Sequence, residues 1–391
     1  MPVAPLDKQE LIQSDRQLAM VLDLNKCIGC QTCTMACKLL WTRYEGMEYM
    51  YWNNVETHPG RGYPKDWQRR GGGFREGRPV KGDLPGLDDY GRAWEYDYQG
   101  VLFEGRSPNI QPDEDEPRWG PNWEEDQGAG FYPNSFYFYF PRLCNHCSRP
   151  ACVLACPRNA LYKRKEDGSV VLNEERCHGY RFCIEACPYD KIYWNAVRKI
   201  SQKCIFCYPR VEQGIPQACA AQCVGRIRFV GFLDDPEGPV YKLVEKWKVA
   251  LPLHPEFETE PNVFYIPPLS PPRYHEDGTV SDEPRVPIGY LLWLFGPRVR
   301  EALDTLKREL EKVQNGGRSE LMELLEARSY RDLFKLDKSP NPRFNEYACA
   351  SCGVAQSCTS PLKSRLAGTA TASSLRVLNG SRTSSGTRTP T

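Results

Sequence analysis

The pattern of hydrophobic and polar positions predicts a few short strands and two late helices. An alternating apolar pattern through Leu18–Leu24 indicates a strand. Two further apolar runs flank the turn signal Asp167-Gly168 and predict a β-hairpin. Helical periodicity covers Arg298–Gln314 and Ser319–Ala327, with an Asn-Gly-Gly break between them. The expected fold class is therefore α+β.

Three long segments show neither period. Residues 38–143 are rich in Gly, Pro, Trp and Tyr, which favours ordered loops that dock a partner; a poorly ordered insertion is the alternative. Residues 250–272 are rich in proline and aromatic residues, and we expect an extended strap over a surface. Residues 346–391 are rich in Ser, Thr and Gly, and we expect them to be disordered.

Charge and hydropathy restrict the class of protein. The 391 residues include 51 Lys and Arg and 50 Asp and Glu, so the net charge of +1 points neither to nucleic acid nor to an anionic membrane surface. The apolar stretch Ile288–Phe295 is far shorter than the roughly 20 residues of a membrane-spanning helix, and we expect no transmembrane segment. The first residues lack an ordinary secretion signal, so we expect any export to occur with a partner.

Cysteine is the most unusual component, with 18 in the chain. Four runs contain fifteen of them, and the spacing of the first, C-x2-C-x2-C-x3-C, is that of bacterial ferredoxins. The runs are Cys27, Cys30, Cys33 and Cys37; Cys144, Cys147, Cys152 and Cys156; Cys177, Tyr180, Cys183 and Cys187; and Cys204, Cys207, Cys219 and Cys223. In ferredoxins three thiolates of a run bind one cluster and the fourth binds the neighbouring cluster, so the runs are expected to work in pairs.

The pairing follows from the ends of the runs. Runs two and three are separated by a short hairpin and both end in Cys-Pro, at Pro157 and Pro188. Runs one and four lack that proline and pair by elimination. The expected ligand sets are Cys27, Cys30, Cys33 and Cys223; Cys37, Cys204, Cys207 and Cys219; Cys144, Cys147, Cys152 and Cys187; and Cys156, Cys177 and Cys183.

Tyr180 stands where the last set would need a cysteine. Because three sets have four thiolates and one has three, we predict three [4Fe–4S] clusters and one [3Fe–4S] cluster. Tyr180 would then set the cluster type, which is one determinant of reduction potential. The alternative is that the Tyr180 phenol binds iron and preserves a four-iron cluster.

Zinc and disulfides fit these cysteines less well than iron–sulfur clusters do. Zinc sites use cysteine pairs separated by a dozen or more residues, and a disulfide scaffold has no reason to repeat this spacing. We expect structural or supporting roles for His146 and His178, and we interpret the three cysteines at 349, 352 and 358 as adventitious. The chain has no dinucleotide fingerprint, P-loop, nucleophile elbow or zinc-protease motif, so we expect no substrate site on it.

These observations predict two pseudo-repeated ferredoxin-like halves with long loop-rich insertions. One half, holding two clusters, combines residues 16–37 with residues 197–235, and the other spans residues 144–196 and holds two more. Residues 38–143 form the insertion, residues 236–345 the strap and a C-terminal helical segment, and residues 346–391 the tail.

The order of the runs resembles the beta subunits of respiratory nitrate reductase and its relatives. The shared features are the long insertion, the aromatic residue in run three and the eleven residues between Cys207 and Cys219. The stretches DLNKCIGCQTCTMACK, CHGYRFCIEACPYDKIYWN and KCIFCYPRVEQGIPQAC are similar to the branch that contains ethylbenzene dehydrogenase, dimethylsulfide dehydrogenase, selenate reductase and chlorate reductase. The resemblance covers roughly residues 16 to 345, and the tail departs from it.

The resemblance implies an electron-transfer subunit. Its partners would be a catalytic alpha subunit, which carries a molybdenum bis-pyranopterin and one more iron–sulfur cluster, and a haem b gamma subunit. Run one would face the molybdenum side and the three-iron site the haem side. The resemblance also implies a periplasmic complex, exported folded with the catalytic subunit; the cytoplasmic face of the membrane is the alternative.

Two other functions are weighed against this one. A free-standing polyferredoxin that shuttles electrons is the alternative, but a diffusing carrier would not need an aromatic insertion and a strap, whereas a docking surface would. A zinc-dependent nucleic-acid binder disagrees with the neutral charge.

Overall fold

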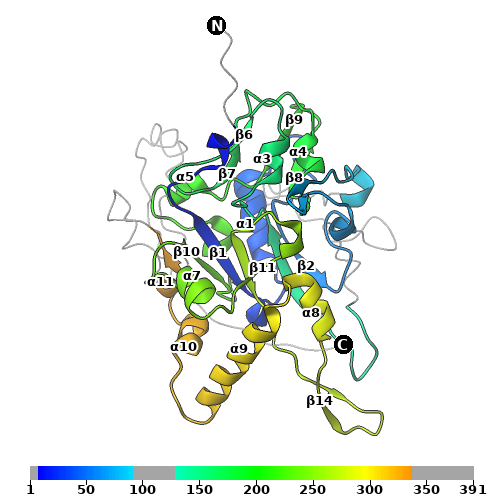
Figure 1. The fold of residues 1–391 in the computed structure, drawn as a ribbon, viewed down its shortest axis with the longest axis vertical. Coiled ribbons are helices and arrows are strands. Elements are labelled where there is room, and N and C mark those ends of the chain that lie inside the picture. Colours follow the sequence, from blue (N-terminus) through cyan, green and yellow to red (C-terminus); the bar gives the residue numbers. More distant parts are fainter. Residues whose placement is uncertain (1–7, 91–127, 337–391) are drawn as a thin grey trace, which may run out of the picture. The chain divides into compact units, whose positions relative to one another are not determined.

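The computed structural model describes residues 8–90 and 128–336, which lie in one compact unit. As expected, the fold mixes helices and strands (Figure 1). The strands are β1 (Leu18–Asp23), β2 (Asn53–His58), β3 (Phe74–Arg75), β4 (Arg78–Pro79), β5 (Phe138–Leu143), β6 (Leu161–Lys163), β7 (Val170–Leu172), β8 (Ile192–Asn195), β9 (Ile200–Lys203), β10 (Arg228–Phe232), β11 (Leu251–Pro252), β12 (Val263–Ile266), β13 (Pro272–Tyr274), β14 (Val280–Pro284) and β15 (Phe334–Lys335). The helices are α1 (Thr32–Trp41), α3 (Ala151–Ala155), α4 (Phe182–Glu185), α5 (Tyr208–Val211), α6 (Ala218–Ala221), α7 (Pro239–Tyr241), α8 (Ile288–Phe295), α9 (Val299–Gln314), α10 (Glu320–Glu326) and α11 (Tyr330–Leu333).

The main sheet has five strands in the order β11-β12-β1-β10-β15. β1 confirms the predicted first strand; it pairs antiparallel with β10 and parallel with β12. All six of its residues are buried, because Leu18, Met20 and Leu22 pack into one hydrophobic cluster and Ala19 and Val21 into another. The alternating pattern therefore identified the strand but not the burial of both its faces.

Residues 250–272 are not the surface strap that the sequence suggested. They include β11 and β12, and β12 lies next to β1 inside the main sheet. Val263, Tyr265 and Ile266 are fully buried. A β-branched and aromatic stretch of this kind fits an interior strand, while the flanking prolines confine it to four residues.

The insertion of residues 38–143 contains more regular structure than expected. β2 pairs antiparallel with β5 from Asn53↔Leu143 to His58↔Phe138, and every residue of β2 is buried. Its sequence, NNVETH, is too polar for a hydrophobic pattern to reveal it. Residues 91–127, which include the acidic sequence DEDE at positions 113–116, lie outside the described residues.

One hairpin follows each of the two middle cysteine runs. The β6–β7 hairpin confirms the prediction around Asp167-Gly168, and the β8–β9 hairpin, which leads from run three into run four, was not predicted. Helix α3 packs against α4 beside these hairpins (Figure 1). Helix α1 packs against α6. The four cysteine runs are thereby placed in two groups.

The late helices also agree with the sequence. Helices α9 and α10 match the two predicted segments, and the Ser319 side chain caps α10 by accepting a hydrogen bond from the Met322 amide. In the part of the chain that the structure describes, no helix is long and apolar enough to cross a membrane. The predicted disordered tail and its three cysteines lie outside that part.

Candidate metal centres

The four cysteine runs share one backbone feature. In each run the residue directly before the second ligand position has a positive φ: Gly29 at 65°, His146 at 44°, Gly179 at 69° and Phe206 at 53°. A left-handed residue turns the chain sharply, which lets a short loop carry two neighbouring ligand positions to the same hollow. Tyr180 follows Gly179 as Cys30 follows Gly29, so the tyrosine occupies the position of a ligand.

Gly29 and Gly179 must be glycine because their surroundings leave no room for a side chain. A Cβ atom on Gly29 would lie 2.6 Å from the Tyr139 ring. A Cβ atom on Gly179 would lie 2.6 Å from both the Lys199 carbonyl oxygen and the Trp194 ring. These contacts are too short for a carbon atom, so the loops of runs one and three depend on glycine at these points.

Site I is a small hollow lined by Cys27, Cys30, Cys33 and Cys223. Cys33 belongs to α1 and Cys223 follows α6, so the packing of these helices joins runs one and four. Burial raises the pKa of Cys27 to about 12, and the nearby Cys33 and Cys223 thiols contribute to this rise. Cys30 is exposed, which leaves site I open on one side.

Site II is a second small hollow, lined by Cys37, Cys204, Cys207 and Cys219. All four cysteines are buried. The Trp41 indole N–H donates to Cys207 Sγ at 3.1 Å, and the Phe206 amide donates to Cys204 Sγ at 3.3 Å. Such donors to sulfur favour the thiolate form that a metal requires.

Site III brings together Cys144, Cys147, Cys152 and Cys187 through the packing of α3 against α4. Burial raises the pKa of Cys147, and the Cys144 and Cys187 thiols raise it further. Burial likewise raises the pKa of Cys152 well above its ordinary value, and the Cys187 thiol makes the next largest contribution to this rise. The four thiols therefore lie close enough to affect one another.

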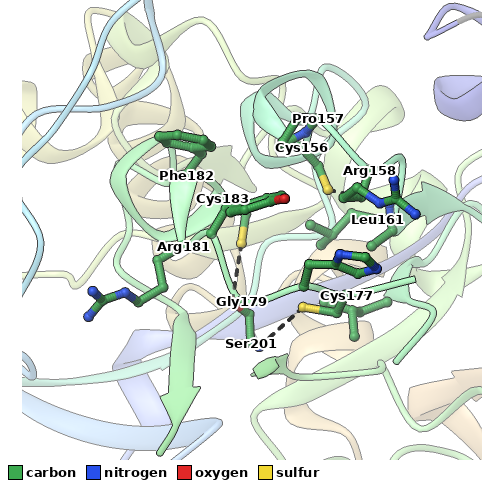
Figure 2. A pocket seen from close by; sticks show the side chains of 14 residues that line it. Cys156, Pro157, Arg158, Leu161, Cys177, Gly179, Arg181, Phe182, Cys183 and Ser201 are labelled. Atoms are coloured by element: carbon green, nitrogen blue, oxygen red, sulfur yellow. Dashed lines mark hydrogen bonds between the residues drawn. The ribbon is translucent and has the colours of Figure 1, made fainter. Parts of the chain in front are cut away.

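Site IV is a small hollow lined by Cys156, Cys177, Cys183 and Tyr180. Figure 2 shows the three sulfur atoms directed into the same space, with Ser201 beside two of them. The Ser201 amide donates to Cys177 Sγ at 3.5 Å, and its hydroxyl lies 3.5 Å from Cys183 Sγ. Tyr180 is 54% exposed, so this site is open to solvent through its tyrosine.

The buried thiols of these sites fit a bound group that contains metal cations. Burial raises the pKa of Cys183, Cys187 and Cys219 to about 12, so without a compensating cation these thiols stay protonated at neutral pH. Among residues 8–90 and 128–336, no group of three His, Cys, Asp or Glu side chains could hold one metal ion. An iron–sulfur cluster differs from a single ion because each thiolate binds a different iron atom.

The sites follow one another in the order I, II, III, IV. Helix α1 carries Cys33 to site I and Cys37 to site II. In the other half, the segment of α3 carries Cys152 to site III, and Cys156 directly follows it into site IV. Burial raises the pKa of Cys204 well above its ordinary value, and the next largest contribution comes from the Cys144 thiol. Cys204 belongs to site II and Cys144 to site III, so these two sites are adjacent.

The two histidines differ in environment. His146 is buried, stacks on Phe206 with ring centroids 4.4 Å apart, and accepts a hydrogen bond from the Val170 amide. Burial lowers its pKa well below the ordinary value, so this ring is neutral. His178 is exposed at the rim of site IV. Neither position changes the expectation that the histidines support the sites rather than bind metal.

Sequence reasoning missed the side chains that contact the sulfurs from outside the runs. Trp41 and Ser201 lie beyond the ligand spacing, and only the folded chain brings them to Cys207 and Cys183. Ser201 lies in β9, a strand that the sequence did not reveal. No motif marks either residue, because each acts through a tertiary contact.

Comparisons with known proteins indicate that the chain contains 4Fe-4S domains. A family model for a 4Fe-4S dicluster domain matches residues 135–233, and one for a 4Fe-4S binding domain matches residues 18–39. The beta subunit of dimethylsulfide dehydrogenase from Rhodovulum sulfidophilum is 59% identical over 82% of this chain and 99% of its own length. The beta subunit of selenate reductase from Thauera selenatis is 57% identical with the same coverage. The respiratory nitrate reductase 1 beta chain of Escherichia coli is 38% identical over 75% of this chain and 79% of its own.

Proposed function

This chain belongs to the family of electron-transfer beta subunits that includes those of dimethylsulfide dehydrogenase, selenate reductase and respiratory nitrate reductase, and we propose from this premise what its four sites hold. Sites I, II and III each hold a [4Fe–4S] cluster, and site IV holds a [3Fe–4S] cluster. The two pseudo-repeated ferredoxin-like halves would each contribute two of these sites. Both alternatives, a free carrier and a nucleic-acid binder, are disfavoured by relatives that are subunits of oxidoreductases.

One observation carries this proposal: the hollows of sites I, II and IV are each lined by cysteines from two different runs. Site I combines run one with Cys223, and site II combines run four with Cys37. The cross-over of the fourth ligand is the arrangement expected for paired clusters in ferredoxins. A set of unrelated buried thiols would not repeat this exchange.

The residues of the chain act by holding, shielding and tuning these groups. Iron–sulfur clusters, when bound, supply one-electron acceptance and release. The buried ligands, among them Cys37, Cys204 and Cys219, keep water away from site II. Hydrogen-bond donors such as the Trp41 indole and the Ser201 amide stabilise negative charge on sulfur, which favours the reduced state.

The proposed partners lie at the two ends of the series. Cys30 and Ile28 are exposed at site I, and Tyr180 and Phe182 are exposed at site IV, whereas the ligands of site II are buried. Open first and last sites fit a subunit that receives electrons from one protein and passes them to another. We assign the side of site I to a molybdenum-containing alpha subunit and the side of site IV to a haem b gamma subunit. The periplasmic location is a further proposal, which fractionation of cells would test.

The three-iron assignment at site IV rests on the donor set. Three thiols line the hollow, and the fourth ligand position is a tyrosine whose ring is more than half exposed. Iron–sulfur clusters are held by thiolates, and a soft sulfur ligand suits them better than the oxygen of a phenol. Loss of the fourth iron is therefore favoured over its retention by Tyr180.

The test is iron and acid-labile sulfide analysis of the purified complex, together with electron paramagnetic resonance of its oxidised form. About 15 irons on this chain are expected, because three clusters have four irons and one has three. The oxidised complex should show the signal of a three-iron cluster. Protein dominated by zinc would overturn the proposal as a whole, whereas about 16 irons without that signal would overturn only the assignment of site IV.

A further inference from the structure

Two of the fully buried cationic side chains near the cysteine sites, Arg228 and Lys203, have no carboxylate partner among the described residues. Arg228, at the start of β10, donates to Asn53 Oδ1 at 2.8 Å and contacts Met20 Sδ at 3.6 Å. Lys203, at the end of β9, donates to the carbonyl oxygens of Cys204, at 2.8 Å, and Val170. Within residues 8–90 and 128–336, neither side chain forms an ion pair with Asp or Glu.

This arrangement differs from that of Arg142, which is buried to the same degree. Arg142 Nε lies 2.7 Å from a carboxylate oxygen of Glu56, so the fold supplies a counter-charge to this cation. Burying an unpaired charge is strongly unfavourable, because the protein interior solvates it far less well than water does. Arg228 and Lys203 therefore need negative charge from another source.

Arg228 lies between sites I and II. The preceding residue, Ile227, lines site I, and the residue to which Arg228 donates, Asn53, lines site II. Burial alone would lower the pKa of Arg228, but the sulfurs of Cys33, Cys219 and Cys223 raise it. Cys33 and Cys223 belong to site I and Cys219 to site II, so the guanidinium is close to both ligand sets.

Lys203 lies between sites II and III. It precedes Cys204 of site II and donates to the carbonyl of that residue. It also donates to the Val170 carbonyl, and the Val170 amide donates to His146, which lies between two ligands of site III. Lys203 therefore lies against the backbone of a site II ligand and, through Val170 and His146, beside the loop between two site III ligands.

The physical consequence concerns adjacent negative charges. A site with four thiolates is net negative, and each electron that arrives adds to this charge. In a medium of low dielectric constant, electrons on neighbouring sites repel one another strongly. A fixed cation between two such sites stabilises the reduced state of both and weakens the repulsion between them.

We propose that Arg228 and Lys203 are shared counter-charges, Arg228 for sites I and II and Lys203 for sites II and III, and that each sets the reduction potentials of its two neighbouring sites together. This inference rests on the proposed occupancy of the sites by iron–sulfur clusters. It assigns an electrostatic role to two residues outside the ligand sets.

The test is a redox titration of the purified complex, followed by electron paramagnetic resonance, for the neutral variants R228Q and K203M. R228Q should lower the equilibrium constant for reduction at least tenfold at sites I and II, which is 59 mV for one electron, and leave site IV unchanged. K203M should lower it at sites II and III and leave site I unchanged. The charge-retaining variants R228K and K203R should stay within threefold of the wild type at every site.

Iron analysis of each variant separates this inference from the proposed function. Wild-type protein without iron would refute the occupancy of the sites. Neutral variants with full iron and unchanged potentials, or with the same shift at all four sites, would refute only the shared counter-charges. If R228Q loses iron, R228M replaces it as the neutral variant that fills the space. Loss of iron from every neutral variant, with R228K and K203R intact, would assign both charges to cluster retention and overturn their effect on potential.

Discussion

Arg142 Nε lies 2.7 Å from Glu56 Oε1, and both side chains are buried, Glu56 on β2 and Arg142 on the paired strand β5. The same carboxylate oxygen accepts hydrogen bonds from the Tyr63 amide and the Asn54 side chain. Arg142 also donates to the carbonyls of Tyr63 and Tyr189. Because Tyr189 follows the site III ligand Cys187 by two residues, this ion pair fastens the insertion to the segment that carries a metal ligand.

Replacing Glu56 with Gln should destabilise the holoprotein by about 3–5 kcal/mol, because it leaves the Arg142 charge buried without its partner. The free energy of unfolding in urea, followed by circular dichroism, measures this loss. The exposed pair Arg273–Glu283 provides a control, with the two atoms 3.3 Å apart. Glu283→Gln should change the free energy by less than about 1 kcal/mol. Equal effects of the two substitutions would contradict the role of the buried pair.

The stabilisation by Glu56 should depend on pH. Burial alone would raise the pKa of this carboxyl, but Arg142 and then His58 hold it well below its ordinary value. A carboxyl group whose pKa is lowered in the folded state stabilises the protein at a pH above its unfolded pKa of about 4.3. This stabilisation is lost as the pH falls further. The difference between wild type and Glu56→Gln should thus be constant from pH 7 to 5.5. At pH 3.5 it should be smaller by about 1 kcal/mol, and a difference that grows in acid would refute the assignment.

Tyr180→Cys should complete the ligand set of site IV. The variant should bind about one further iron per chain, lose the oxidised three-iron signal and show a lower potential at this site. Tyr180→Phe is the matched control, because it keeps the ring at the fourth position and removes only the phenol oxygen. Iron content and the oxidised resonance signal should be unchanged in Tyr180→Phe; loss of iron there would show that the phenol binds iron.

Ser201→Ala should lower the potential of site IV. The hydroxyl lies 3.5 Å from Cys183 Sγ and can donate to the thiolate when the site is loaded. Removing one such weak bond makes reduction less favourable by about 0.5–1 kcal/mol, or about 20–40 mV for one electron. Ser201→Thr retains the hydroxyl and should keep the wild-type potential in a redox titration. An unchanged potential in the alanine variant would exclude this contribution.

Gly179→Ala should impair site IV selectively. The residue has a φ of 69°, and an added Cβ would lie 2.6 Å from the Lys199 carbonyl oxygen. The expected result is partial loss of the three-iron signal with the other three sites still loaded. Gly278→Ala separates the two causes, since Gly278 has a φ of 82° but no atom within 4 Å of the added Cβ. That control should retain all four clusters and lose only about 1 kcal/mol of stability.

The sequence predicted those parts of the molecule whose signal is local. Each such signal depends only on residues that are close together in the sequence, as in the helical period of α9, the turn at Asp167-Gly168 and the spacing of the ligands. The strand β2 escaped prediction because its buried polar groups, such as Glu56, are satisfied by partners that only the fold supplies. The interior position of β12 and the contacts of Trp41 and Ser201 with sulfur likewise depend on distant segments.

Helix α1 carries Cys33 and Cys37 one helical turn apart to two different hollows, and the segment around α6 does the same with Cys219 and Cys223. Neither hollow can be assembled without ordering the scaffold of the other. Maturation of the apoprotein should therefore be nearly all-or-none for this half, and intermediates loaded at only one of the two positions should be scarce during biogenesis.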